Sequence, residues 1–141
     1  MTPAHEPTRM TPGPETPVVG VGVVILDQGR LLVVRRAKEP GKGLWAVPGG
    51  KVNAGEPLRV AAARETLEET GLVVEVGEVA WVGEHINGKH HIVLIDFFAE
   101  ISGGEAKPGD DADELAWVSV EDPGEIPVTL TMHQLLDTLR L

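Results

Sequence analysis

Four glutamates lie between residues 50 and 72, and three of them are spaced to share one helix face. Glu65, Glu68 and Glu69 occupy positions i, i+3 and i+4, which project from the same side of a helix. Gly71 follows directly and is typical of a C-terminal cap. Carboxylates at a helix C-terminus cost about 0.3–1 kcal/mol each, and their mutual repulsion adds a similar amount. We therefore expect this helix to hold a cation, and all-oxygen ligands favour a hard ion such as Mg²⁺ or Mn²⁺.

The residues around these glutamates indicate the elements that position them. A turn is predicted at Pro48, Gly49 and Gly50. A helix is predicted from Pro57 to Thr70, because proline suits the first helical position. Part of its apolar face is expected to come from Leu58, Ala61, Ala62 and Leu67.

Strands and one further helix account for most of the rest of the chain. The predicted strands are residues 18–26, 30–36, 45–47, 73–84, 90–102 and 114–118, and the terminal helix is residues 131–139, with Leu135, Leu136 and Leu139 on its core side. The first two strands are expected to pair as a hairpin. The strand of residues 90–102 is apolar on both faces, so we expect it to be central and covered on both sides. Within it, Asp96 must either face a pocket or be satisfied internally.

Composition limits the classes of protein to which this chain can belong. At 141 residues one domain is expected, here residues 17–141 after a Pro- and Thr-rich flexible tail of residues 1–16. A net charge of −10 argues against nucleic-acid or membrane binding. The chain has no cysteine, which excludes disulfides and thiolate chemistry. No apolar stretch is long enough to cross a membrane and no signal peptide is recognisable, so a cytoplasmic location is expected.

The stretch from residue 50 to residue 72 resembles the signature of the Nudix hydrolase family, G-x5-E-x7-R-E-U-x-E-E-x-G-U, where U is apolar. The matching residues are Gly50, Glu56, Arg64, Glu65, Glu68, Glu69, Gly71 and Leu72. Thr66 departs from the pattern, which has an aliphatic residue there. The resemblance extends to the W-x-x-P-G-G turn of residues 45–50 and to the acidic loop that ends at Trp117. It implies an α+β, α/β/α sandwich with a mixed sheet and a loop–helix–loop signature.

The resemblance also implies roles for individual residues in metal binding and catalysis. Glu65, Glu68 and Glu69 would be the metal ligands, and one of these glutamates would also serve as a general base. The carbonyl of Gly49 would complete the metal shell. Glu56 has two readings, a structural one at the helix N-terminus and one in support of the metal site. Arg64 would pair with Glu56 and orient the other glutamates.

Three further positions are candidates for catalysis or substrate binding. Related enzymes supply a carboxylate from the acidic loop as ligand or base, and Asp111 is the first candidate here, ahead of Glu114; a solvated loop is the alternative. Arg36 would contact substrate phosphate, with plain surface charge as the alternative. Trp45 is a candidate for stacking on a nucleobase, although most aromatic residues of this size belong to the core.

The function that the resemblance implies is Mg²⁺-dependent hydrolysis of the diphosphate in a nucleoside diphosphate linked to X. Nucleoside triphosphates are favoured, because the chain has no tyrosine and no proline about 15 residues past the signature, which mark other substrate classes. The alternatives are an ADP-ribose or nucleotide-sugar pyrophosphatase and, in another class, a non-catalytic nucleotide sensor. A homodimer is expected by analogy alone.

Overall fold

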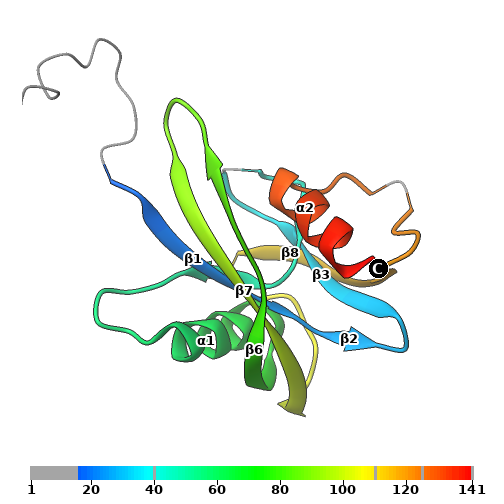
Figure 1. The fold of residues 1–141 in the computed structure, drawn as a ribbon. Coiled ribbons are helices and arrows are strands. Elements are labelled where there is room, and N and C mark those ends of the chain that lie inside the picture. Colours follow the sequence, from blue (N-terminus) through cyan, green and yellow to red (C-terminus); the bar gives the residue numbers. More distant parts are fainter. Residues whose placement is uncertain (1–15, 40, 110, 125, 141) are drawn as a thin grey trace, which may run out of the picture.

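The structure is a computed structural model that describes residues 16–39, 41–109, 111–124 and 126–140. Two four-stranded sheets lie side by side, with one helix against each of them (Figure 1). The tail predicted for residues 1–16 lies outside the described residues except for Thr16. No helix in the described ranges is long and apolar enough to span a bilayer.

The first sheet is mixed, as expected from the sequence. It contains β1 (Val18–Val24), β5 (Gly49–Lys51), β6 (Leu72–Ile86) and β7 (His91–Gly104) in the order β5-β1-β7-β6. β1 runs parallel to β7, whereas the β1–β5 and β6–β7 pairs are antiparallel. The parallel pair brings Gly22 opposite Asp96, and the antiparallel pair brings Gly22 opposite Gly49.

The second sheet contains β2 (Leu26–Asp27), β3 (Arg30–Arg36), β4 (Trp45–Ala46) and β8 (Ala112–Ser119). The predicted hairpin of residues 18–26 with residues 30–36 is wrong for most of its length. Only β2 pairs with β3, because the chain leaves the first sheet after Val24 and enters the second at Leu26. The turn that joins them has positive φ at Gln28 and Gly29, the geometry of a tight two-residue hairpin.

The predicted helix begins one residue later than expected. α1 spans Leu58–Thr70, with Pro57 as its N-cap and Gly71 as its left-handed C-cap, which confirms the predicted cap. The expected apolar face is wrong in part, because Leu58 and Leu67 are exposed. The face against the sheet is made of smaller residues and one acid, namely Ala61, Ala62, Thr66, Glu69 and Thr70. Thr66 fits there because its hydroxyl donates to the carbonyl of Ala62 at 2.7 Å.

Two apolar cores hold the layers together. The first joins α1 to the mixed sheet through Val21, Val23, Leu72 and Phe97, among others. The second joins α2 (Leu130–Leu139) to the second sheet, and Leu135 and Leu136 are buried there as predicted.

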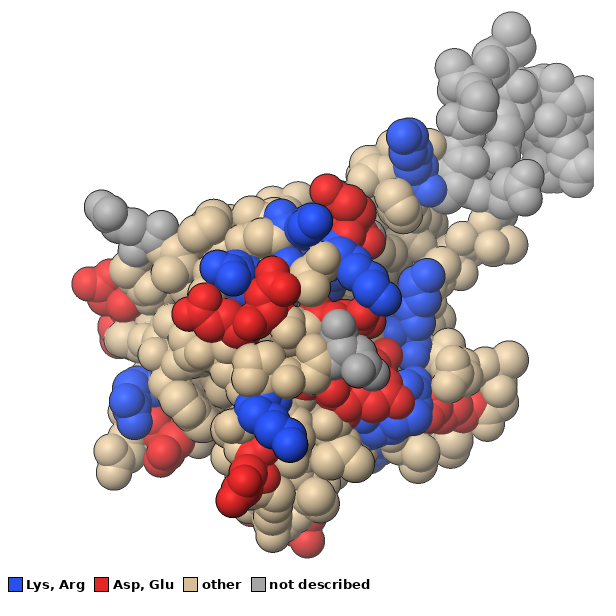
Figure 2. Space-filling model, turned by 180° about the vertical axis from the view of Figure 1, so that it is seen from behind, with Lys and Arg blue, Asp and Glu red and all other residues tan. Residues whose placement is uncertain are grey.

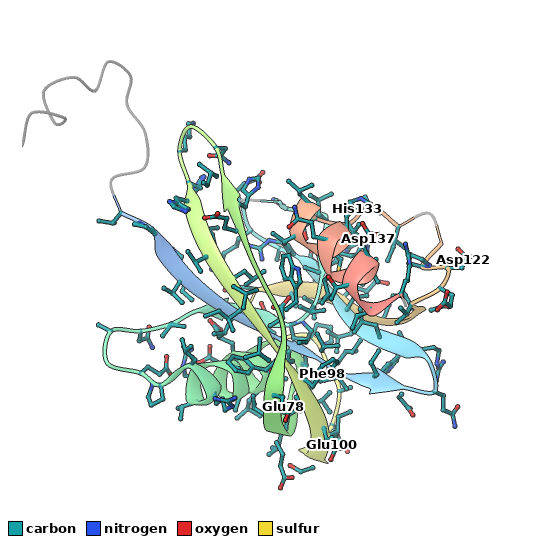
Figure 3. The ribbon with its side chains drawn as sticks, in the orientation of Figure 1. Glu78, Phe98, Glu100, Asp122, His133 and Asp137 are labelled. Carbon is teal, nitrogen blue, oxygen red and sulfur yellow. The ribbon has the colours of Figure 1, made fainter. Side chains whose placement is uncertain are left out.

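β7 is central in its sheet, as predicted, but it is not covered on both sides along its whole length. Phe98 and Ile101, in its second half, are 39% and 44% exposed. Figure 3 shows Phe98, Glu100 and Glu78 at this end of the β6–β7 pair, far from His133 and Asp137 on α2. The other half of β7 therefore provides the sheltered surface of the sheet.

Candidate active site

The Gly-Gly turn before α1 packs directly against two of the glutamates. The amide of Gly49 donates a hydrogen bond to Glu69 Oε1 at 2.9 Å. A Cβ at Gly50 would overlap the carboxylate of Glu65, and a Cβ at Gly49 would overlap the carbonyl of Val21. Both glycines are therefore required by close approach, and the turn lies between β1 and the acidic face of the helix.

Arg64 holds the acidic cluster together by contacting three carboxylates. Its Nε and Nη2 donate to the two oxygens of Glu56 at 2.7 and 2.9 Å, a bidentate pair. Its Nη1 donates to Glu68 Oε1 at 3.1 Å and lies 3.7 Å from Glu65 Oε1. The hydrogen bond from Arg64, with one from the Asn53 amide, lowers the pKa of Glu56 to about 2. The predicted Glu56–Arg64 pair is present.

Glu65 and Glu69 are held in surroundings that oppose their ionisation. Burial raises the pKa of both carboxyls to about 7. A hydrogen bond with Glu68 raises the pKa of Glu65 further. The nearby charge of Glu65 raises the pKa of Glu69, whereas the hydrogen bond from the Gly49 amide lowers it. The cluster therefore concentrates acidic groups that would gain from a nearby cation.

The loop after β7 brings Asp111 to this cluster. The amide of Lys107 donates to the carbonyl of Thr70 at 2.8 Å, and that of Gly109 to the carbonyl of Glu69 at 2.7 Å. These bonds satisfy carbonyls that the end of α1 leaves without helical partners. The negative charge of Asp111 contributes to the raised pKa of both Glu65 and Glu69, and its own Oδ1 forms an ion pair with Lys38 Nζ at 2.8 Å.

Arg36 connects the acidic cluster to a neighbouring cavity. Its positive charge lowers the pKa of Glu69, and its side chain lines a cavity of about 490 Å³. β1, the Gly-Gly turn, β7 and the start of α2 enclose this cavity, and its lining is predominantly apolar. Arg35, the preceding residue, instead pairs with Glu114 at 3.3 Å. Arg36 is thus the arginine near the site, and Glu114, the second candidate from the acidic loop, is engaged elsewhere.

Trp45 lies in the second core. The residue is 8% exposed and packs with residues of α2, and it is not among the described residues that line the cavity. Stacking of a base on Trp45 therefore has no support from the geometry. The structure adds Lys51 and the segment from Thr129 to Met132 to the cavity lining. The sequence pattern gave no sign of that segment, because its role depends on where α2 packs.

The acidic residues fit a hard divalent cation by their chemistry. Among the described residues, no three Asp, Glu or His side chains form a ready-made metal shell. Glu68 is turned toward Arg64, and Glu69 toward the Gly49 amide. The available donors are all oxygens, which Mg²⁺ prefers, and a cation would relieve the repulsion that raises the pKa of Glu65 and Glu69. Figure 2 shows a face of the molecule on which acidic and basic side chains lie beside each other.

Known proteins are similar in sequence to this chain along most of its length. Residues 16–139 match the family profile described as NUDIX domain. A MutT-like protein of Streptomyces ambofaciens is 34% identical over 95% of this chain and 84% of its own length. An ADP-ribose pyrophosphatase of Methanocaldococcus jannaschii is 38% identical, over 75% of this chain and 64% of its own length. An 8-oxo-dGDP phosphatase of Mus musculus is 31% identical, over 87% of this chain and 38% of its own length.

A solved structure agrees with these sequence matches. The MutT NUDIX hydrolase from Burkholderia pseudomallei superposes with a TM-score of 0.82 at 32% identity, covering 89% of this chain and 99% of that one. The chain therefore belongs to the NUDIX family of hydrolases.

Proposed function

We propose that this protein is a Mg²⁺-dependent pyrophosphohydrolase that cleaves the diphosphate of a nucleoside diphosphate linked to X, with nucleoside triphosphates as its favoured substrates. The observation that carries the proposal is the position of Arg36 between the acidic cluster and a largely apolar cavity. A nucleotide joins a flat base, which suits the cavity, to anionic phosphates, which suit Arg36 and a cation held by the acidic cluster.

In this proposal the metal would be held by Glu65, Glu68 and Glu69, with the carbonyl of Gly49 as a further oxygen donor. When bound, Mg²⁺ supplies neutralisation of the diphosphate charge and a lowered pKa for water. Mn²⁺ is the alternative ion with the same ligand preference. Glu56 keeps Arg64 in place, and Arg64 in turn fixes the direction of Glu68.

The protein's own side chains have three remaining tasks. Arg36 binds phosphate oxygens, the cavity takes the nucleobase, and one carboxylate accepts the proton of the attacking water. Glu68, Glu69 and Asp111 are the candidates for the proton acceptor.

Hydrolysis of ADP-ribose or a nucleotide sugar is the second candidate function. It is favoured by the similarity to the ADP-ribose pyrophosphatase of Methanocaldococcus jannaschii. The name of the mouse relative, an 8-oxo-dGDP phosphatase, instead supports a purine nucleotide with its own phosphate chain. The predicted homodimer and the predicted cytoplasmic location stay predictions.

The experiment that tests the proposal is a panel of nucleoside triphosphates, ADP-ribose and nucleotide sugars, with release of phosphate and pyrophosphate as the readout. Each compound is assayed with Mg²⁺, with Mn²⁺ and with EDTA, for the wild type and for Glu69→Gln. Glu78→Gln is the matched control, because Glu78 is an exposed glutamate on β6. We expect metal-dependent turnover that falls at least about 100-fold in Glu69→Gln and is unchanged in the control. Tight binding of a nucleotide without turnover would instead establish a sensor.

A further inference from the structure

A second hollow, of about 410 Å³, lies at the other end of β7 from the cavity beside the acidic cluster. It is lined by residues at the point where the chain passes from β1 to β2, and by β6 and β7. None of its lining residues also lines the first cavity. The hollow is therefore a separate surface feature that the proposed reaction does not use.

Two large apolar side chains in this hollow are exposed to solvent. Phe98 is 39% exposed and Leu26 is 45% exposed, and the buried residues Val24 and Ala99 line the hollow as well. Figure 3 shows Phe98 at this end of the sheet, together with Glu100. Exposed aromatic residues are enriched where proteins bind one another, because they supply a large apolar contact. The hollow thus has an accessible apolar surface.

Two glutamates line the same hollow and have no positive partner. Glu75 on β6 and Glu100 on β7 are directly opposite each other in the antiparallel pair, and both are exposed. Neither carboxylate forms an ion pair or a side-chain hydrogen bond within the described part of the chain. Like charges at opposite positions of two strands destabilise the pair. A cation bound in the hollow would relieve this repulsion.

The backbone of β6 is irregular beside the hollow. The pairing of β6 with β7 shifts register between Val76 and Val79, and Gly77, within this stretch, lines the hollow. Such bulges bend a strand and are frequent at functional surfaces. Arg59 of α1 holds this bulge, because its Nε donates to the carbonyl of Gly77 at 3.0 Å and its guanidinium lies 4.9 Å from the centre of the Phe97 ring. The fold therefore fixes the shape of the hollow.

We propose that this hollow docks a basic segment of a partner protein, in which an arginine side chain adjoins an apolar one. The guanidinium would lie beside Glu75 and Glu100 and against the ring of Phe98, and the apolar side chain would contact Leu26. Arginine suits this surface because its planar group binds carboxylates and stacks on aromatic rings. The net charge of −10 would attract such a segment over a longer range. This inference does not depend on the proposed function.

The test uses two dye-labelled synthetic peptides of equal length, one alternating arginine with leucine and the other alternating arginine with glycine. Fluorescence anisotropy gives the Kd of each for the full chain. We expect the arginine–leucine peptide to bind about tenfold more tightly or better, because its leucines bury apolar surface, and to bind more weakly at high salt. Amide chemical shifts should change at residues 24–26, 75–77 and 98–100, which line or adjoin the hollow.

Charge reversal tests the contribution of the two glutamates. Glu100→Lys should weaken binding of the arginine–leucine peptide at least about tenfold, because it places like charges together. Glu121→Lys is the matched control, since it makes the same change at an exposed position outside the hollow, and its Kd should equal that of the wild type. Glu75→Lys combined with Glu100→Lys should instead bind a glutamate–leucine peptide that the wild type does not bind.

Truncation of the aromatic ring tests the apolar contact. Phe98→Ala should raise the Kd of the arginine–leucine peptide at least about tenfold, as for a central aromatic residue of an interface. Ile101→Ala is the control, because Ile101 is 44% exposed on the same strand and does not line the hollow. Urea unfolding of each variant establishes that a loss of binding is not a loss of the fold.

Three results would overturn the inference. The first is equal affinity of the wild type for the two arginine peptides, because net charge alone would then account for binding. The second is a set of shift changes confined to α1, because the peptide would then occupy the acidic cluster. The third is a chain that binds neither peptide and forms a dimer that Phe98→Ala dissociates, because the hollow would then be filled by a second copy.

Discussion

Arg64 and Glu56 face each other across the start of α1 in a bidentate ion pair, with hydrogen bonds of 2.7 and 2.9 Å. Arg64 also contacts Glu68 and the carbonyl of Lys51, so one planar group joins the turn, the helix and the acidic cluster. A guanidinium can make these contacts together because its five N–H donors point in fixed directions.

Replacing Arg64 by lysine should therefore weaken metal binding although the charge is kept. An ammonium group cannot reproduce the paired bonds to Glu56 while also reaching Glu68. We expect the Mg²⁺ concentration for half-maximal activity to rise about 10–100-fold, the range usual for residues that orient metal ligands. A Mg²⁺ titration of hydrolysis measures this. Arg30→Lys, at an exposed position, is the control, and an unchanged titration for Arg64→Lys would refute the orienting role.

The stability of the metal-free protein should fall as the pH rises from about 4.5 to about 7. The pKa values of Glu65, Glu69 and Asp96 are raised to about 7 by burial. The folded protein therefore binds more protons than the unfolded chain in this window, and the free energy of unfolding decreases until all three groups are ionised. The loss should be about 1–3 kcal/mol for each group. Glu56 behaves in the opposite sense, since its lowered pKa gives stability that is lost only as the pH falls toward about 2.

Urea unfolding at pH 5 and pH 8 in EDTA measures this decrease. Glu69→Gln should show a smaller decrease than the wild type, and Glu78→Gln the same decrease. Mg²⁺ should reduce the part of this decrease in unfolding free energy that comes from Glu65 and Glu69. The part that comes from Asp96 should be unchanged. Equal free energies of unfolding of the wild type at the two pH values would contradict the prediction, because ionisation of these carboxyls would then not destabilise the fold.

Replacing Gly109 by alanine should detach the loop that brings Asp111 to the site. A Cβ at Gly109 would overlap the carbonyl of Glu68, and the Gly109 amide donates to Glu69. We expect the free energy of unfolding to fall by about 1–3 kcal/mol, as for other substitutions that break close packing. Activity should fall as well. Gly88→Ala is the control, because nothing lies within 4 Å of its added Cβ. Full activity in Gly109→Ala would show that Asp111 has no role in the site.

Replacing Trp45 by phenylalanine should affect stability and not substrate binding. Trp45 packs in the core against α2 and lies outside the cavity lining. The smaller ring leaves space in that core, which we expect to cost about 1–3 kcal/mol. Urea unfolding and KM for the preferred nucleotide should be measured together. A raised KM at unchanged stability would restore the base-stacking role that the sequence suggested.

The acidic site could be predicted from the sequence because its residues are neighbours along one helix. The spacing of the glutamates places Glu65, Glu68 and Glu69 on one face of the helix and makes that face acidic. Gly71, directly after them, marks the C-terminal cap. The Gly-Gly turn is also local, although its contacts with Glu65 and Glu69 need the fold. The helical pattern alone predicted that Leu58 and Leu67 would be buried, but both are exposed. Which side of the helix is buried depends on the elements that pack against it.

The cavity could not be predicted, because its walls come from segments that are far apart in the chain. The pattern of β1 and β3 resembles a simple hairpin, and nothing local shows that β1 pairs with β7 instead. The place of Asp96 depends on that pairing. Its isolation among apolar residues was a sign that it was unusual, but the choice between a pocket and an internal partner required the register of Gly22 against Asp96.

The parallel pairing of β1 with β7 also has a consequence for how this protein comes to be made. β1 leaves the ribosome before β5 and β7, and it has no strand partner in the first sheet until these two strands have emerged. Contacts so distant in sequence close slowly. α2 follows all the other segments that line the cavity, so it supplies the last wall. A nascent chain, or a fragment cut before residue 129, can therefore contain the whole acidic helix and still have no enclosed place for a base.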